Sequence, residues 1–181
     1  MLNNGIQFCL SSTNDELYQI LDLQSQNFTE SISSSEKEKE GFVTVKHDIK
    51  LLKNMQTKEP HIIAKYDSKV VGYALSMHPD FEEEIEILKP MFHKIKSLLT
   101  GAESFLVMGQ ICIDKSYRKQ GLFKGLYNKM KEEFSSSYNC LITEVASSNQ
   151  RSLNAHYAVG FKDLLIYEAD SVIWHLIKWD W

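Results

Sequence analysis

The clearest structural signal in this chain is the stretch Phe105 to Phe134, FLVMGQICIDKSYRKQGLFKGLYNKMKEEF. Its first part is apolar and long enough for a buried strand. Its last part has an apolar residue at every fourth position, which predicts a helix: Leu122, Leu126, Met130 and Phe134. Between them, Gly121 permits a backbone conformation that other residues avoid. A glycine loop at a helix N-terminus directs N–H groups toward a bound anion, so a phosphate-bearing ligand is the first hypothesis.

The same stretch is basic, although the whole chain has a formal net charge of −4. No carboxylate lies between the first and the last of its six cations. These cations are Lys115, Arg118, Lys119, Lys124, Lys129 and Lys131. A lysine-rich, solvated helix face would have the same composition, so that interpretation stays open beside the phosphate site. The acidic balance of the chain argues against general nucleic-acid binding.

Length and composition predict one globular domain over residues 1–181, with 43% hydrophobic residues and no low-complexity tract. The first residues lack the pattern of a signal peptide, and no apolar run approaches the roughly 18 residues of a membrane span. We therefore expect no membrane partner. Three cysteines without paired spacing indicate reduced thiols of a cytoplasmic protein and no metal site: Cys9, Cys112 and Cys140.

The rest of the chain alternates short strands and helices. Hydrophobic patterns predict strands at 6–10, 61–66, 70–77, 139–146, 161–167 and 171–181. Helices are expected after a capping box at 13–16, over 47–55, along 80–101 with a break at Pro90, and after a second capping box at 147–150. The polar stretch 31–40 is expected to be a loop.

Two motifs give this order a family likeness. The run Arg118-Lys119-Gln120-Gly121-Leu122-Phe123 is similar to the pyrophosphate loop of the GCN5-related N-acetyltransferase (GNAT) superfamily, with Phe123 where that family usually has Gly or Ala. From Glu144 the chain reads EVASSNQRSLNAHYAVGF, which resembles the family's second cofactor segment. Counting back from Gly160, the family's frequent catalytic tyrosine falls on His156 and not on Tyr157.

The resemblance implies an α/β (α+β) fold. Its central sheet would be mixed, mostly antiparallel and flanked by helices. The sheet would splay between the strand ending at Ile113 and the strand ending near Ala146, and acetyl-CoA would enter the gap. The cofactor contacts that the resemblance assigns are Ile111, Cys112, Ile113, Arg118, Lys119, Gln120, Gly121, Leu122, Phe123, Lys124, Asn149, Ser152 and His156.

The implied reaction is direct attack of a primary amine, on a small molecule or a protein, on the acetyl thioester. By the resemblance, Ile111 N–H supports the oxyanion, Glu144 is the base, and His156 protonates the thiolate or orders the pantetheine. Glu144 could equally be a strand-end carboxylate, and His156 a helix-end histidine with satisfied hydrogen bonds. Cys112 is expected to pack in the core.

A non-catalytic acyl-CoA-binding module is the alternative, favoured by Phe123 and by the absent tyrosine. A nucleotide-binding protein fits poorly, because no GxGxxG or Walker lysine motif is present. The acceptor and the oligomeric state stay open. Three C-terminal tryptophans could serve the core, a homodimer surface or the acceptor pocket: Trp174, Trp179 and Trp181.

Overall fold

The computed structural model describes residues 5–28, 42, 43, 45–99, 101 and 103–181. The expected loop at 31–40 lies outside these residues. Seven strands form one sheet in the order β1-β2-β3-β4-β5-β7-β6. Their bounds are β1 Ile6–Leu10, β2 Ile62–Tyr66, β3 Lys69–Met77, β4 Phe105–Ile113, β5 Cys140–Ala146, β6 Lys162–Ala169 and β7 Val172–Asp180. Among the seven strands of the described residues, only the β4/β5 pair is parallel, so the expected mixed, mostly antiparallel sheet is confirmed.

The sheet opens between β4 and β5. These strands pair only from Phe105 with Cys140 to Val107 with Ile142. Just beyond the last pair, Thr143 Oγ1 donates a hydrogen bond of 2.8 Å to the carbonyl of Met108. On its other side, β4 pairs with β3 through a bulge, because β4 has one more residue than β3 between two of their paired positions. Such a bulge bends the strand locally. The expected splay is therefore present, and beyond Val107 this edge of β4 has no strand partner in the part of the chain that the structure describes.

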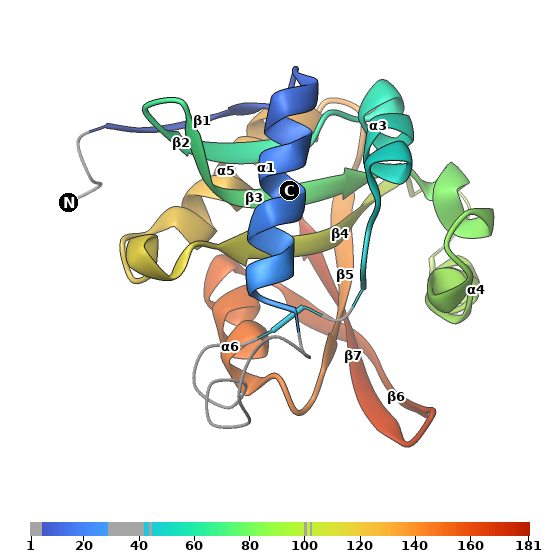
Figure 1. Cartoon of the computed structure of the whole chain (residues 1–181). Helices are drawn as coiled ribbons and strands as arrows, with labels where there is room; N and C mark the ends of the chain where they lie inside the picture. The colour runs from blue at the N-terminus through green and yellow to red at the C-terminus, as the bar shows by residue number, and fades with distance from the viewer. Residues whose placement is uncertain (1–4, 29–41, 44, 100, 102) are drawn as a thin grey trace.

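Helices cover both faces of the sheet. Three helices pack with one hydrophobic cluster: α1 (Asn14–Gln26), α3 (Ile49–Lys58) and α4 (Lys89–Leu98). Two others pack with the second cluster on the opposite face: α5 (Leu122–Phe134) and α6 (Gln150–Val159). Figure 1 shows α1 crossing in front of the strands and α5 behind them. The apolar residues of α5 that are spaced by four therefore face the sheet, as predicted.

Local signals set several helix starts. The capping box at α1 is confirmed, because Thr13 Oγ1 accepts from Glu16 N–H and the Glu16 carboxylate accepts from Thr13 N–H. The predicted capping box before α6 is wrong. Asn149 itself is the N-cap, and its side chain accepts from Ser152 N–H. An Asn at this position satisfies a free N–H of the first turn without help from Gln150.

The segment after Pro79 is less regular than one helix with a kink. Two short 3-10 turns, η2 (Pro79–Glu83) and η3 (Glu86–Leu88), precede α4. Pro90 lies in the first turn of α4, where its missing N–H has no intrahelical acceptor to lose. The break therefore comes before Pro90, not at it.

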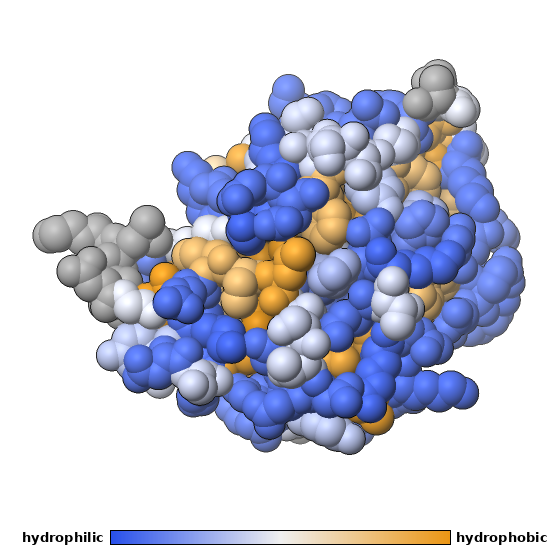
Figure 2. Space-filling model, turned by 90° about the horizontal axis from the view of Figure 1, so that it is seen from above, coloured by the Kyte–Doolittle hydropathy of each residue, from blue (hydrophilic) through white to orange (hydrophobic). Residues whose placement is uncertain are grey.

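The face seen in Figure 2 is mainly hydrophilic, with hydrophobic side chains exposed in a band near its centre. Within the described residues, no helix is long and apolar enough to cross a membrane.

Candidate active site

The basic loop enters α5 through a turn that contains two residues with left-handed backbone. Gly121 is the N-cap with φ +85°, and Lys119 has φ +60°. The first helical hydrogen bond runs from Gly125 N–H to Gly121 C=O, at 3.0 Å. The N–H groups of Leu122 and Phe123 precede it and therefore have no intrahelical acceptor. Left-handed residues next to free N–H groups form a concave nest for anions.

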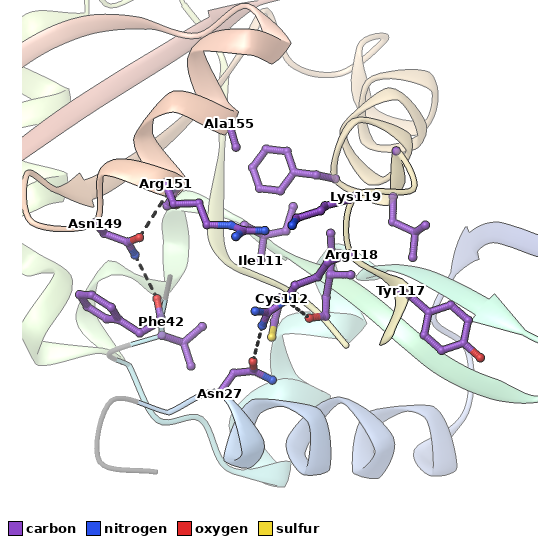
Figure 3. Close-up of a pocket in the computed structure, with 16 residues that line it drawn as sticks. Asn27, Phe42, Ile111, Cys112, Tyr117, Arg118, Lys119, Asn149, Arg151 and Ala155 are labelled. Carbon is purple, nitrogen blue, oxygen red and sulfur yellow. Dashed lines mark hydrogen bonds between the residues drawn. The ribbon is translucent and has the colours of Figure 1, made fainter. Parts of the chain in front are cut away.

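A cavity of about 220 Å³ lies against this loop. Figure 3 shows its lining, which comes from the end of β4, the loop, the start of α6 and the segment at Phe42. Ten of the expected cofactor residues line it: Ile111, Cys112, Ile113, Arg118, Lys119, Gly121, Leu122, Phe123, Asn149 and Ser152. Gln120 and Lys124 are not in this lining. Gln120 Nε2 donates to Ser116 C=O at 3.1 Å, and Lys124 is exposed.

The positively charged side chains at this cavity have two different roles. The Arg118 guanidinium donates to Ile113 C=O at 3.1 Å and to Asn27 Oδ1 at 2.7 Å, so it joins the loop to β4 and to the end of α1. Lys119 and Arg151 extend toward the same part of the cavity from the loop and from α6 (Figure 3). These two cations face the space that an anionic ligand would fill.

A second cavity, of about 80 Å³, lies where β4 and β5 separate. It shares five lining residues with the larger cavity, so the two adjoin: Phe42, Val43, Ile111, Asn149 and Ser152. Its other walls include Gln110 on β4, Glu144 on β5, His156 on α6 and Trp174 on β7. The splay therefore places Glu144 and His156 beside one space, which adjoins the cavity at the glycine loop.

Glu144 is partly buried, and its carboxylate accepts a hydrogen bond from the Tyr167 hydroxyl. Burial raises the pKa of Glu144, while the Tyr167 hydrogen bond and the charge of Lys94 oppose that rise. A carboxylate with a raised pKa is a better proton acceptor, which suits a general base.

His156 is buried, and hydrogen bonds occupy both of its ring nitrogens. Nδ1 lies 2.7 Å from Ser152 C=O, so this nitrogen carries the proton. Nε2 then accepts from the Tyr127 hydroxyl at 2.6 Å. Burial lowers the pKa of His156 to about 4, which keeps the ring neutral at pH 7. The ring also meets Phe123 edge-on at 5.0 Å between centroids, so the residue that departs from the loop motif packs into an aromatic cluster.

Tyr157, the neighbour of His156, points elsewhere. Its hydroxyl donates to Asp163 Oδ1 at 2.8 Å, and it lines neither cavity. Counting back from Gly160 to His156 therefore selects a residue of α6 that lines the same cavity as Glu144.

One cluster of the described residues has side chains close enough to share a metal ion: Glu103, Cys140 and Asp180. Lys178 forms ion pairs with both carboxylates, at 3.0 and 2.9 Å. Burial raises the pKa of the Cys140 thiol to about 11, which disfavours the thiolate that a metal requires. The chemistry of this cluster therefore does not fit a metal site.

Comparison with protein families identifies the family of this chain. The model of the acetyltransferase (GNAT) family matches residues 17–161. The chain belongs to the GNAT family. It is therefore an N-acetyltransferase, and its motif resemblance is confirmed. The search of curated protein sequences found no match.

Solved structures share the GNAT fold at low sequence identity. A chain of the NatC complex bound to Gag peptide and CoA is 11% identical, with a TM-score of 0.67 and coverage of 97% of this chain and 98% of that chain. The ribosomal-protein-S18-alanine N-acetyltransferase of Escherichia coli is 13% identical (TM-score 0.64, coverage 97% and 93%). An N-acetyltransferase of Staphylococcus aureus is 15% identical (TM-score 0.63, coverage 97% and 98%).

Several residues at this GNAT site were missed by sequence reasoning. Arg151 had a local signal, because it is a cation in the first turn of the helix that Asn149 caps. Asn27 and Phe42 line the larger cavity from segments far away in the chain, and Tyr167 reaches Glu144 from β6. No spacing rule connects such distant positions, so only the folded structure reveals them.

Proposed function

We propose that this GNAT protein transfers the acetyl group of acetyl-CoA to a primary amine of a small molecule or a protein by direct attack on the thioester. One observation carries the proposal. The glycine loop before α5 and the partly buried carboxylate of Glu144 lie on adjoining cavities at the β4/β5 splay. The first cavity suits a phosphate-bearing cosubstrate, and the second suits an amine that must lose a proton.

The residues of the larger cavity fit the phosphates of CoA. The free N–H groups that follow Gly121 would bind the pyrophosphate, with Lys119 and Arg151 supplying positive charge. Asn149 and Ser152 lie where the two cavities meet and would contact the pantetheine. Acetyl-CoA, once bound, supplies the activated acetyl thioester.

The residues of the smaller cavity supply the proton transfer and the oxyanion contact. Ile111 lies at the junction of the cavities, on the edge of β4 that β5 leaves open, so its N–H is our candidate donor to the acetyl carbonyl. Glu144 would accept the amine proton, directly or through water. Cys112 is buried, and burial raises the pKa of its thiol to about 12, which disfavours an acyl-enzyme.

For His156, the hydrogen bonds favour the ordering role over proton donation. Its Nδ1–H already donates to Ser152 C=O, and its Nε2 already accepts from Tyr127. A ring held in this way would fix the wall along which the pantetheine lies.

The sequence analysis also left open a non-catalytic acyl-CoA-binding module, which membership of the GNAT family disfavours. Amine-dependent release of the CoA thiol, measured with a panel of amines and N-terminal peptides, separates the two functions. Peptides come first because two similar structures are named for a peptide ligand or a protein substrate. We expect turnover with at least one amine and an acidic limb in the pH–rate profile that Glu144→Gln abolishes. Binding of acetyl-CoA without turnover of any amine would favour the module.

A further inference from the structure

Two buried glutamines join residues 45–47 to the sheet and to α1. Gln24 on α1 and Gln110 on β4 are 3% and 6% exposed. His47 N–H donates to Gln24 Oε1 at 3.0 Å, and Gln110 Nε2 donates to Val45 C=O at 2.7 Å. Between them, Gln24 Nε2 donates to Gln110 Oε1 at 2.9 Å. The two side chains form one bridge with a backbone group at each end.

The backbone ends fix the orientation of both amides. A backbone N–H can only donate and a backbone C=O can only accept, so each glutamine has one possible assignment of oxygen and nitrogen. Gln110 Oε1 then also accepts from the Tyr73 hydroxyl, at 2.6 Å. Gln24 Nε2 also reaches His47 Nδ1 at 3.0 Å, so this nitrogen accepts and the imidazole is neutral. Every hydrogen bond in the bridge has a donor facing an acceptor.

The bridge holds one wall of the smaller cavity. Residues 42, 43 and 45–47, called the strap below, contribute Phe42, Val43 and Val45 to that wall. The outer part of the strap has other anchors. Phe42 C=O accepts from Asn149 Nδ2 at 3.2 Å, and Val43 N–H donates to Asn27 C=O at 3.2 Å. Gln24 and Gln110 therefore anchor residues 45–47, and Val45 of this part lines the same cavity as Glu144.

We propose that Gln24 and Gln110 are positioning residues for the amine acceptor, because they hold the segment of Val45, which lines the same cavity as the carboxylate that would deprotonate the amine. The role in acceptor binding rests on the proposed function, whereas the bridge itself does not. Neither glutamine takes part in the chemistry. Their loss should therefore raise the KM for the amine much more than it lowers kcat.

Two variants break the bridge in different ways. Gln110→Glu keeps an oxygen for Tyr73 and Gln24 but places a second oxygen against Val45 C=O. Gln24→Met removes both polar ends at similar length. Tyr73→Phe is the matched control, because it removes a hydrogen bond from the same Gln110 oxygen and leaves both backbone anchors intact. Near-ultraviolet circular dichroism verifies that each variant is folded.

Hydrogen exchange of the His47 amide reports on the bridge without any ligand, and steady-state kinetics reports on the acceptor. We expect at least tenfold faster exchange and an at least tenfold higher amine KM in both bridge variants. The kcat and the Kd for acetyl-CoA should stay within threefold, and Tyr73→Phe should change no quantity by more than threefold.

Exchange of the His47 amide within threefold of wild type in both folded variants would overturn the bridge. Faster exchange with an unchanged amine KM would overturn its role in acceptor binding. A wild-type protein that turns over no amine would refute the proposed function, while the exchange rates would still decide whether the bridge holds the strap.

Discussion

The hydroxyl of Tyr167 on β6 donates a hydrogen bond to the carboxylate of Glu144 on β5, from 23 residues further along the chain. The Lys94 ammonium of α4 lies 4.3 Å from the centroid of the same tyrosine ring. Three elements therefore set the electrostatic environment of the proposed base. The hydrogen bond stabilises the charged carboxylate, whereas burial favours the protonated acid.

Tyr167→Phe should move the acidic limb of the kcat/KM profile to higher pH. The carboxylate loses a donor that lowers its pKa, so Glu144 would stay protonated, and inactive as a base, up to a higher pH. The control is Tyr157→Phe, because that hydroxyl binds Asp163 outside both cavities. A limb that stays in place in Tyr167→Phe, with activity retained, would show that Glu144 is not the titrating base.

Substitution of Gly121 should weaken acetyl-CoA binding. At φ +85°, a side chain adds a backbone penalty of roughly 1–2 kcal/mol. Gly121→Glu also places a carboxylate beside the proposed phosphate position, so we expect its KM for acetyl-CoA to rise by about tenfold or more. Gly101→Ala is the control, since an added Cβ there meets nothing within 4 Å. Unaltered cofactor kinetics in Gly121→Glu would contradict the loop assignment.

Arg151→Ala should raise the Kd for CoA by about tenfold, which corresponds to about 1.4 kcal/mol of a charged phosphate contact. Arg151→Lys should restore part of this loss, because a point charge remains. Isothermal titration calorimetry measures both values. Lys50→Ala removes an exposed positive charge from α3, outside the cavity lining, and serves as the control. Equal effects of Arg151→Ala and Lys50→Ala would mean that only net charge matters.

Three buried histidines should make the fold sensitive to acid. Burial lowers the pKa of His47, His61 and His156 to about 4, from an ordinary value near 6.5. Between these limits the unfolded chain binds more protons than the folded chain, so the free energy of unfolding falls as the pH drops from 6.5 to 4. The largest slope is about 1.4 kcal/mol per pH unit for each histidine.

Urea denaturation at intervals between pH 7 and pH 4 measures this slope. His61→Gln should remove about one third of it, relative to wild type. His93→Gln, at an exposed position, should leave it unchanged. The same pH dependence in all three proteins would contradict the assignment.

Cys112→Ala should retain activity, with kcat within about threefold of wild type. The thiol lines the larger cavity, but burial raises its pKa to about 12 and leaves almost no thiolate at pH 7. Mass spectrometry of the protein mixed with acetyl-CoA alone tests the same point. An acetylated Cys112 peptide that loses its acetyl group when amine is added would show a covalent route.

The sequence predicted the strands and helices well where local rules apply. The period of α5, the hairpin of β2 and β3, and the stop of α6 at Gly160 all follow from residues within a few positions of each other. The wrong predictions concern places where two local signals compete, and the sequence pattern does not show which of them prevails. Asn149 caps α6 in place of the expected capping box, and Pro90 enters a helix that begins at Lys89.

The sequence by itself predicted the glycine loop before α5, because a left-handed glycine at a helix start depends on neighbouring residues alone. It also placed Glu144 and His156 at the spacing that brings them to one cavity. Only the tertiary structure decided the environment of these groups. The Tyr167 contact, the two bonded nitrogens of His156 and the Gln24–Gln110 bridge join residues far apart in the chain. Such contacts depend on strand order and on the β4/β5 splay, which bring together side chains whose separation in sequence carries no signal.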